Sequence, residues 1–88
     1  MIEKEVTVIN RAGIHTRPAA SIVKLSAKFK AEVFLILDGF SINGKSIMGV
    51  MTLAAAQGAK LIIRADGADE EESINELAKL FDDGFGEM

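Results

Sequence analysis

Four segments with a β-strand pattern and three helical segments occur in only 88 residues, and their order limits the chain to few folds. We expect strands where apolar residues alternate with polar ones, and helices where apolar residues recur every three or four positions. The expected strands cover 3–9, 32–37, 40–43 and 60–65, and the expected helices cover 16–29, 47–53 and 70–83. The element order is therefore βαββαβα.

This order predicts an α+β fold with two layers, in a single domain that covers residues 1–88. Asp38-Gly39 lies between two β-branched and apolar runs, which is a strong signal for a two-residue hairpin turn. A hairpin makes its two strands antiparallel. We therefore expect a mainly antiparallel four-stranded sheet with all three helices packed on one face.

The last helix has its own boundary signals. Asp69 is followed three residues later by Glu72, which resembles a capping box with Asp at the N-cap. An apolar stripe with helical spacing runs through 74–81, and Gly84 suits the position just after a helix. We expect residues 85–88 to form a frayed tail.

The stretch Gly13-Ile14-His15-Thr16-Arg17-Pro18-Ala19 contains the only histidine and the only proline of the chain. Proline fits the first turn of a helix, so a helix is expected to begin near Thr16 or Arg17 with His15 at its start. The first backbone N–H groups of a helix have no internal partner, and with the helix dipole they form a site for an anion such as phosphate.

His15 and Arg17 complement such an anion site. The positive end of a helix favours a neutral, nucleophilic imidazole, and the guanidinium of Arg17 has a forked set of donors that suits phosphate oxygens. Together they predict a histidine that accepts a phosphoryl group. The alternative is a capping or surface histidine beside an ordinary arginine.

Composition and charge exclude several other classes of protein. The chain has no cysteine and one histidine, so neither a metal site nor a disulfide is expected. No apolar run is long enough to span a bilayer, and the charged start does not resemble a signal peptide, so we expect a cytoplasmic protein without membrane insertion. Residues 1–45 are net basic and 46–88 net acidic, an asymmetry too mild to indicate nucleic-acid binding but suited to an acidic partner or phosphorylated ligand.

A second motif points elsewhere. Residues 39–46 match the P-loop pattern GxxxxGKS, in which backbone N–H groups wrap the phosphates of a nucleotide. However, Phe40 and Ile42 alternate with polar residues as in a strand, and Asp38-Gly39 explains the first glycine as a turn. A chain of this length also cannot hold the βαβ crossovers of a nucleotide-binding sheet. We interpret the match as a coincidence.

The string GIHTRPAASIV, together with the chain length and element order, resembles the HPr family of histidine-containing phosphocarrier proteins of the bacterial phosphoenolpyruvate-dependent sugar phosphotransferase system. The resemblance implies an open-faced β-sandwich with strand order 1-4-2-3. It also implies that His15 is phosphorylated on Nδ1, that Arg17 assists, and that the backbone N–H groups of Thr16 and Arg17 bind phosphate. The implied partners are enzyme I and the IIA domains of sugar permeases, with no cofactor and a monomeric carrier that is not itself an enzyme.

The residues after Lys45 carry two further predictions. Ser46 is a plausible N-cap of the helix 47–53, and Lys45-Ser46-Ile47-Met48-Gly49 also resembles the regulatory serine segment of the family, which HPr kinase/phosphorylase modifies and a transcriptional regulator reads. Both roles remain open. An alternative function is therefore a mainly regulatory paralogue or binding module that acts through Ser46.

A partner-binding surface is expected on the first two helices. Ile47, Met48 and Met51 cannot all point to the core of a short helix, and methionine suits surfaces that bind several partners. Ala20 and Lys24 lie on the face of the first helix that points away from its core side. The resemblance places the docking face of HPr on these two helices; the alternative is that these apolar residues belong to the core or to a plain exposed face.

Overall fold

The computed structural model describes residues 1–87, and Met88 lies outside the described residues. The described chain forms β1 (Ile2–Thr7), α1 (Thr16–Ser26), β2 (Glu32–Leu37), β3 (Phe40–Asn43), α2 (Ile47–Thr52), β4 (Lys60–Asp66), α3 (Glu70–Asp82) and a short 3₁₀ helix, η1 (Gly84–Gly86). The predicted order βαββαβα is confirmed, and η1 is an addition to it.

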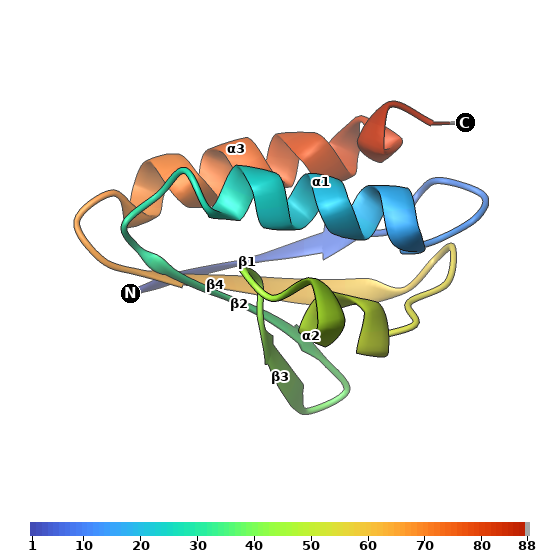
Figure 1. Cartoon of the computed structure of the whole chain (residues 1–88), viewed down its shortest axis with the longest axis horizontal. Helices are drawn as coiled ribbons and strands as arrows, with labels where there is room; N and C mark the ends of the chain where they lie inside the picture. Colours follow the sequence, from blue (N-terminus) through green and yellow to red (C-terminus); the bar gives the residue numbers. More distant parts are fainter. Residues whose placement is uncertain (88) are drawn as a thin grey trace.

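The four strands form one antiparallel sheet in the order β1-β4-β2-β3. Helices α1 and α3 lie side by side above this sheet, and the smaller α2 packs beside α1 next to β3 (Figure 1). The opposite face of the sheet carries no helix among the described residues. The predicted α+β class, the two layers and the strand order are all confirmed.

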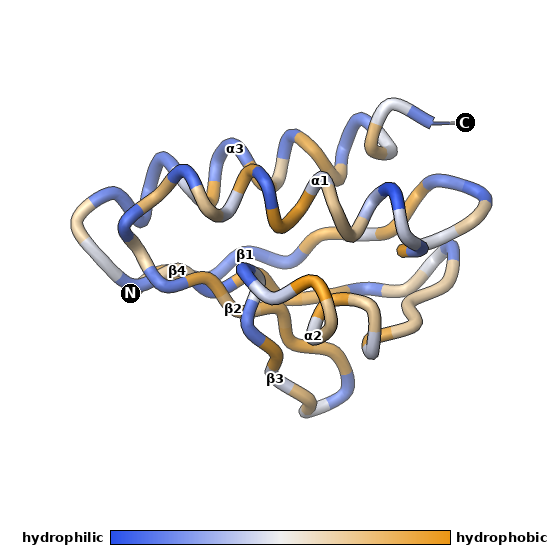
Figure 2. The backbone as a smooth tube through the Cα atoms, viewed as in Figure 1, coloured by the Kyte–Doolittle hydropathy of each residue, from blue (hydrophilic) through white to orange (hydrophobic). Residues whose placement is uncertain are grey.

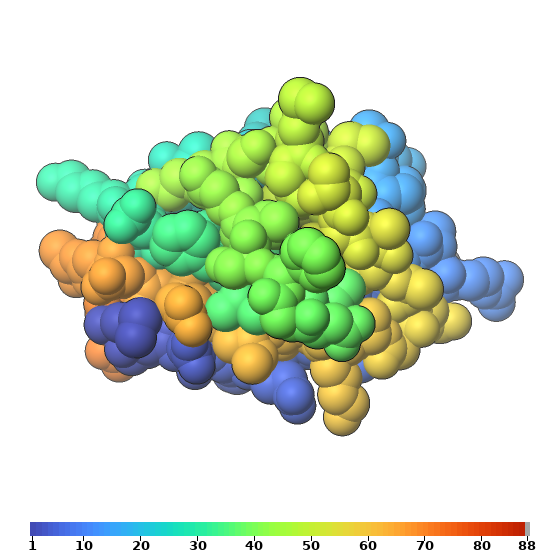
Figure 3. All heavy atoms as spheres, turned by 90° about the horizontal axis from the view of Figure 1, so that it is seen from below, coloured from blue at the N-terminus to red at the C-terminus, as the bar shows by residue number. Residues whose placement is uncertain are grey.

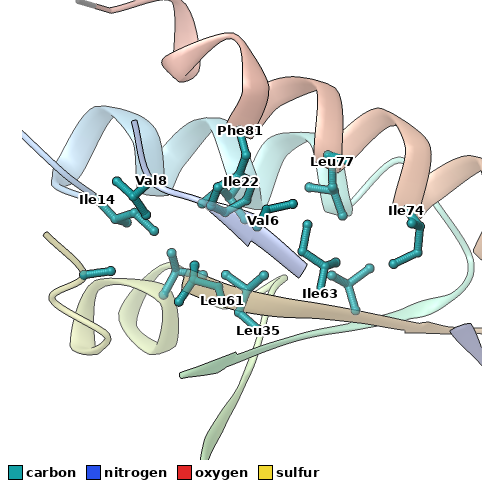
Figure 4. Close-up of a cluster of buried hydrophobic side chains, with 14 of the residues drawn as sticks. Val6, Val8, Ile14, Ile22, Leu35, Leu61, Ile63, Ile74, Leu77 and Phe81 are labelled. Carbon is teal, nitrogen blue, oxygen red and sulfur yellow. The ribbon is translucent and has the colours of Figure 1, made fainter. Parts of the chain in front are cut away.

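The hydrophobic core lies between the sheet and the two long helices. Along α1 and α3, hydrophobic stretches alternate with hydrophilic ones at each turn, as expected of helices with one buried face (Figure 2). Side chains from α3 point toward the sheet and meet those of β1, β2 and β4 (Figure 4). Ile22, Leu35, Ile63, Leu77 and Phe81 are all completely buried.

The turn between β2 and β3 follows the sequence prediction. Asp38 and Gly39 both have positive φ angles, 50° and 85°, as the right-handed twist of a two-residue hairpin requires. Leu37 pairs with Phe40 directly across this turn. Aspartate tolerates this backbone conformation better than most residues, which explains the Asp-Gly pair.

Two predicted boundaries are wrong by two or three residues. Helix α1 ends at Ser26 rather than at residue 29. The backbone N–H groups of Lys28 and Phe29 bond to carbonyls only three residues back, which is the 3₁₀ pattern and not the α-helical one. Strand β1 ends at Thr7 rather than at residue 9, since Val8 bonds to the loop before β4 instead of to the strand itself.

The predicted capping box at Asp69 is also wrong. The Asp69 side chain makes no bond to the first turn of α3. Its two oxygens instead accept hydrogen bonds from the backbone N–H groups of Lys30 and Ala31, at 2.9 and 2.8 Å. These bonds lower the pKa of Asp69, the one from Lys30 most strongly. Asp69 therefore fastens the start of α3 to the connection before β2.

The predicted frayed tail is wrong for residues 85–87, while residue 88 lies outside the described residues. The ring of Phe85 packs edge-on against Phe81 with 4.9 Å between the ring centres, and the backbone N–H of Glu87 donates to Gly84. Gly84 has a φ of 60° and occupies the predicted position just after the helix. Burial of an aromatic ring thus holds this segment against the body of the protein.

Candidate functional site

His15 occupies the N-cap position of α1, as predicted. Its backbone is extended (φ −110°, ψ −162°), and its carbonyl accepts the first helical hydrogen bond from Ala19 at 2.9 Å. The imidazole makes no capping bond to the helix, and the side chain is 40% exposed. The backbone of His15 is therefore fixed at the helix start, while its ring is accessible from outside the protein.

Gly13 explains how the loop before His15 is held. Its φ is +74°, and a Cβ atom at this position would lie only 2.5 Å from the carbonyl oxygen of Ala55. The same carbonyl accepts a 2.9 Å hydrogen bond from the N–H of Ile14, which is buried. Only glycine fits this close approach, which locks the loop to the segment that follows α2.

The first turn of α1 presents donors beside the ring. Pro18 has no N–H and Ala19 bonds back to His15, so Thr16 and Arg17 carry the N–H groups of this turn that lack an intrahelical acceptor. Thr16 and the Arg17 side chain are exposed. These groups can bind an anion next to His15 with the help of the helix dipole.

Glu87 completes the site and was missed by sequence reasoning. Its Oε1 lies 3.1 Å from His15 Nε2 and accepts a 3.1 Å hydrogen bond from Asn10 Nδ2. The bond with His15 is the largest cause that lowers the pKa of Glu87, followed by the bond from Asn10 and by the charges of His15 and Arg17. The available signal was Phe85 between two glycines, since a free tail does not need an aromatic residue.

Asn10 links Glu87 to the loop that carries His15. Only 2% of Asn10 is exposed, and its Nδ2 donates both to Gly13 O at 2.8 Å and to Glu87. One buried amide group therefore fixes the glycine before the histidine and the carboxylate beside it.

Ser46 is the N-cap of α2, as predicted. Its Oγ accepts a hydrogen bond from the N–H of Gly49 at 3.1 Å, and its carbonyl accepts one from Val50 at 2.9 Å. The side chain is only partly buried. Capping therefore explains the serine structurally.

The residues expected to bind partners are all exposed. On α2, the exposed fractions of Ile47, Met48 and Met51 are 41%, 77% and 44%, whereas Val50 is completely buried. On α1, Ala20 and Lys24 are exposed as well. Helices α1 and α2 pack against each other, and α2 and β3 lie at the surface of the face seen in Figure 3. We call these five exposed residues the α1–α2 surface.

Membrane-crossing helices and clusters of metal-binding side chains are both absent from residues 1–87. In this part of the chain, no helix combines the length and the apolar character that crossing a membrane requires. Over the same residues, no group of three histidine, aspartate or glutamate side chains is arranged to hold a metal ion.

Comparison with known proteins identifies the family. Residues 2–83 match the family model described as "PTS HPr component phosphorylation site". The chain belongs to the HPr family. It is 42% identical to the phosphocarrier protein HPr of Treponema pallidum, over 99% of each chain, and 44% identical to that of Xylella fastidiosa, over 99% of this chain and 98% of the relative.

Solved structures agree with this assignment. An HPr structure from Thermoanaerobacter tengcongensis superposes with a TM-score of 0.96 at 40% identity and covers 100% of this chain and 99% of its own. The Bacillus subtilis protein Crh, described as a catabolite repression protein, superposes with a TM-score of 0.77 at 38% identity over 96% of this chain and 97% of its own. The chain is thus an HPr-type phosphocarrier protein of the phosphotransferase system.

Proposed function

We propose that His15 accepts a phosphoryl group from phosphorylated enzyme I, which phosphoenolpyruvate has charged, and passes it to the IIA domain of a sugar permease. The observation that carries this proposal is the position of His15, an accessible imidazole at the start of α1 in a chain of the HPr family. A histidine in this place can use its own lone pair as the nucleophile.

Thr16 and Arg17 assist the transfer in this proposal. Their backbone N–H groups and the Arg17 guanidinium bind the phosphoryl oxygens as charge develops on them. The phosphohistidine must remain transferable, so this stabilisation has to be moderate. An exposed arginine at the rim of the site suits that requirement because water weakens its interaction with the phosphate.

The α1–α2 surface docks both partners in turn. Its exposed apolar residues on α2 supply a dry contact, and Lys24 on α1 supplies a cation for an acidic partner surface. One shared surface explains how a small carrier can meet a donor and an acceptor in alternation. The carrier acts as a monomer and turns over no substrate alone, although an HPr of Thermoanaerobacter tengcongensis has also been solved as a dimer.

Ser46 gives the carrier a second, regulatory input. A phosphate on Ser46, added by HPr kinase/phosphorylase, would place about −1.5 to −2 charges beside Ile47 and Met48. The helix start tolerates that charge, so its effect falls on partner binding and on recognition by a transcriptional regulator. We expect Ser46→Asp to keep the melting temperature within a few degrees while weakening enzyme I binding. A large fall in melting temperature would make Ser46 a structural cap only.

A mainly regulatory protein is the second candidate, and the similarity to Crh favours it. A reconstituted relay separates the two functions. Labelled phosphoenolpyruvate, enzyme I, this chain and a IIA domain are mixed, and each component is omitted in turn. The phosphocarrier proposal predicts label on the IIA domain only when this chain and enzyme I are both present. If the label never passes beyond enzyme I, the phosphocarrier proposal fails and the regulatory function is the remaining candidate.

A further inference from the structure

The contact between Glu87 and His15 has a consequence for the chemistry of the imidazole. The two residues are 72 positions apart, and only the anchored end of the chain brings them together. Phe85 packs on Phe81, and the backbone N–H of Glu87 donates to the carbonyl oxygen of Gly84 at 2.9 Å. These two contacts fix the backbone that carries the carboxylate. Its side chain is 21% exposed.

The direction of the hydrogen bond follows from charge. The lowered pKa of Glu87 keeps the carboxyl group ionised near neutral pH, and an ionised carboxylate can only accept hydrogen bonds. Asn10 Nδ2 donates to the same Oε1 and confirms it as an acceptor. The ring nitrogen on the other side of the 3.1 Å contact, His15 Nε2, must then carry the proton. In a neutral ring this leaves the lone pair on Nδ1.

We propose that Glu87 is a positioning residue: it holds His15 as the tautomer with the proton on Nε2 and so makes Nδ1 the nucleophile. The inference rests on the proposed function of His15 as phosphoryl acceptor. Glu87 does not touch the phosphoryl group. It acts through the imidazole, as a carboxylate does when it orients a histidine from the side opposite the reaction.

The phosphoryl transfer requires no movement of the proton on Nε2. The Nδ1 lone pair attacks the phosphorus, a new Nδ1–P bond forms, and the N–P bond of the donor phosphohistidine breaks with its electron pair returning to the donor ring. The His15 ring gains positive charge, which the Glu87 carboxylate stabilises across the existing hydrogen bond. During onward transfer the Nδ1–P bond breaks, its electron pair returns to the His15 ring, and the charge disappears.

Repulsion between the Glu87 carboxylate and the incoming phosphoryl group is the competing explanation. Glu87 is close enough to Arg17 for the guanidinium charge to lower its pKa. A carboxylate that repelled the incoming phosphoryl group would slow the transfer, and its removal would then speed phosphorylation. The sign of the rate change therefore separates a positioning carboxylate from a blocking one.

The test compares Glu87→Ala, Glu87→Gln and the unchanged chain in two measurements. Nitrogen-15 NMR of protein labelled in histidine reports the tautomer, and the single histidine gives one pair of ring signals. We expect the Nε2–H form in the unchanged protein at a pH where the ring is neutral, and a mixture in Glu87→Ala. Rapid-quench phosphorylation by enzyme I should be about tenfold slower for Glu87→Ala. Glu87→Gln retains an accepting oxygen without the charge, so its phosphorylation rate and its tautomer should lie between those of Glu87→Ala and the unchanged protein.

Asp82→Asn is the matched control. Asp82 is exposed at the end of α3, so this variant removes a carboxylate from the same end of the helix without losing a contact to His15. It should leave the tautomer and the rate unchanged. A Nδ1–H ring in the unchanged protein, a tautomer unaffected by Glu87→Ala, or faster phosphorylation of that variant would overturn the proposal. If no protein accepts phosphate, the proposed function fails, and the tautomer measurement still decides the role of Glu87.

Discussion

Truncation of Met48 to alanine tests whether the α1–α2 surface is a docking site or loosely packed core. Met48 is 77% exposed, so folding removes only about a quarter of its surface from water. Complete burial of a methionine side chain is worth about 1.5–3 kcal/mol, and a quarter of this is about 0.5 kcal/mol. We therefore expect Met48→Ala to lower the free energy of unfolding by about 0.5 kcal/mol, which is a small shift of the denaturant midpoint.

Binding should respond much more strongly than folding. Truncation of an apolar residue at the centre of an interface costs about 2 kcal/mol, or about thirtyfold in affinity, and calorimetric titration against enzyme I measures this. Val50→Ala is the matched control on the same helix: Val50 is completely buried, so that variant should lose about 2 kcal/mol of stability. A large loss of stability with normal affinity in Met48→Ala would refute the docking role.

Three further variants test other parts of the account. Arg17→Ala should leave the melting temperature unchanged and slow phosphorylation about 100-fold in a rapid-quench assay, because the exposed guanidinium acts only on the developing charge. The hydrogen bonds from Lys30 and Ala31 lower the pKa of Asp69, so their stabilisation is present above its ordinary pKa of 3.8 and is lost as the pH falls below it; Asp69→Asn should therefore flatten the acid side of a plot of melting temperature against pH. Ala54 has a φ of +48°, a conformation that costs alanine roughly 1 kcal/mol, and Ala54→Gly should raise the free energy of unfolding by about 0.5 kcal/mol in denaturant titrations.

Local features were predicted from the sequence because neighbouring residues determine them. Pro18 and the apolar run after it placed the start of α1, Ser46 capped α2, and Asp38-Gly39 formed the hairpin turn. The exposure of Ile47 and Met48 was predictable for the same reason, since adjacent residues on a short helix cannot share one buried face.

The missed features depend on residues that are distant in the sequence. Asp69 was expected to cap α3, but its carboxylate bonds to Ala31, which is 38 positions away. Glu87 was assigned to a frayed tail, and its bond to His15 spans 72 positions. Periodicity and capping rules describe neighbours, so such bonds become visible only once the chain is folded. The N-cap position of His15 could therefore be predicted from the sequence, and its contact with Glu87 could not.

The mass of the intact chain after incubation with phosphoenolpyruvate and enzyme I tests the central claim most directly. We expect a gain of one phosphate that is lost in acid, as expected of a phosphohistidine. We expect no such gain in His15→Ala, whose melting curve should remain that of a folded protein. A phosphohistidine on this chain can only be His15, because the chain has one histidine. An unchanged mass, or an acid-labile phosphate that persists in His15→Ala, would contradict the account.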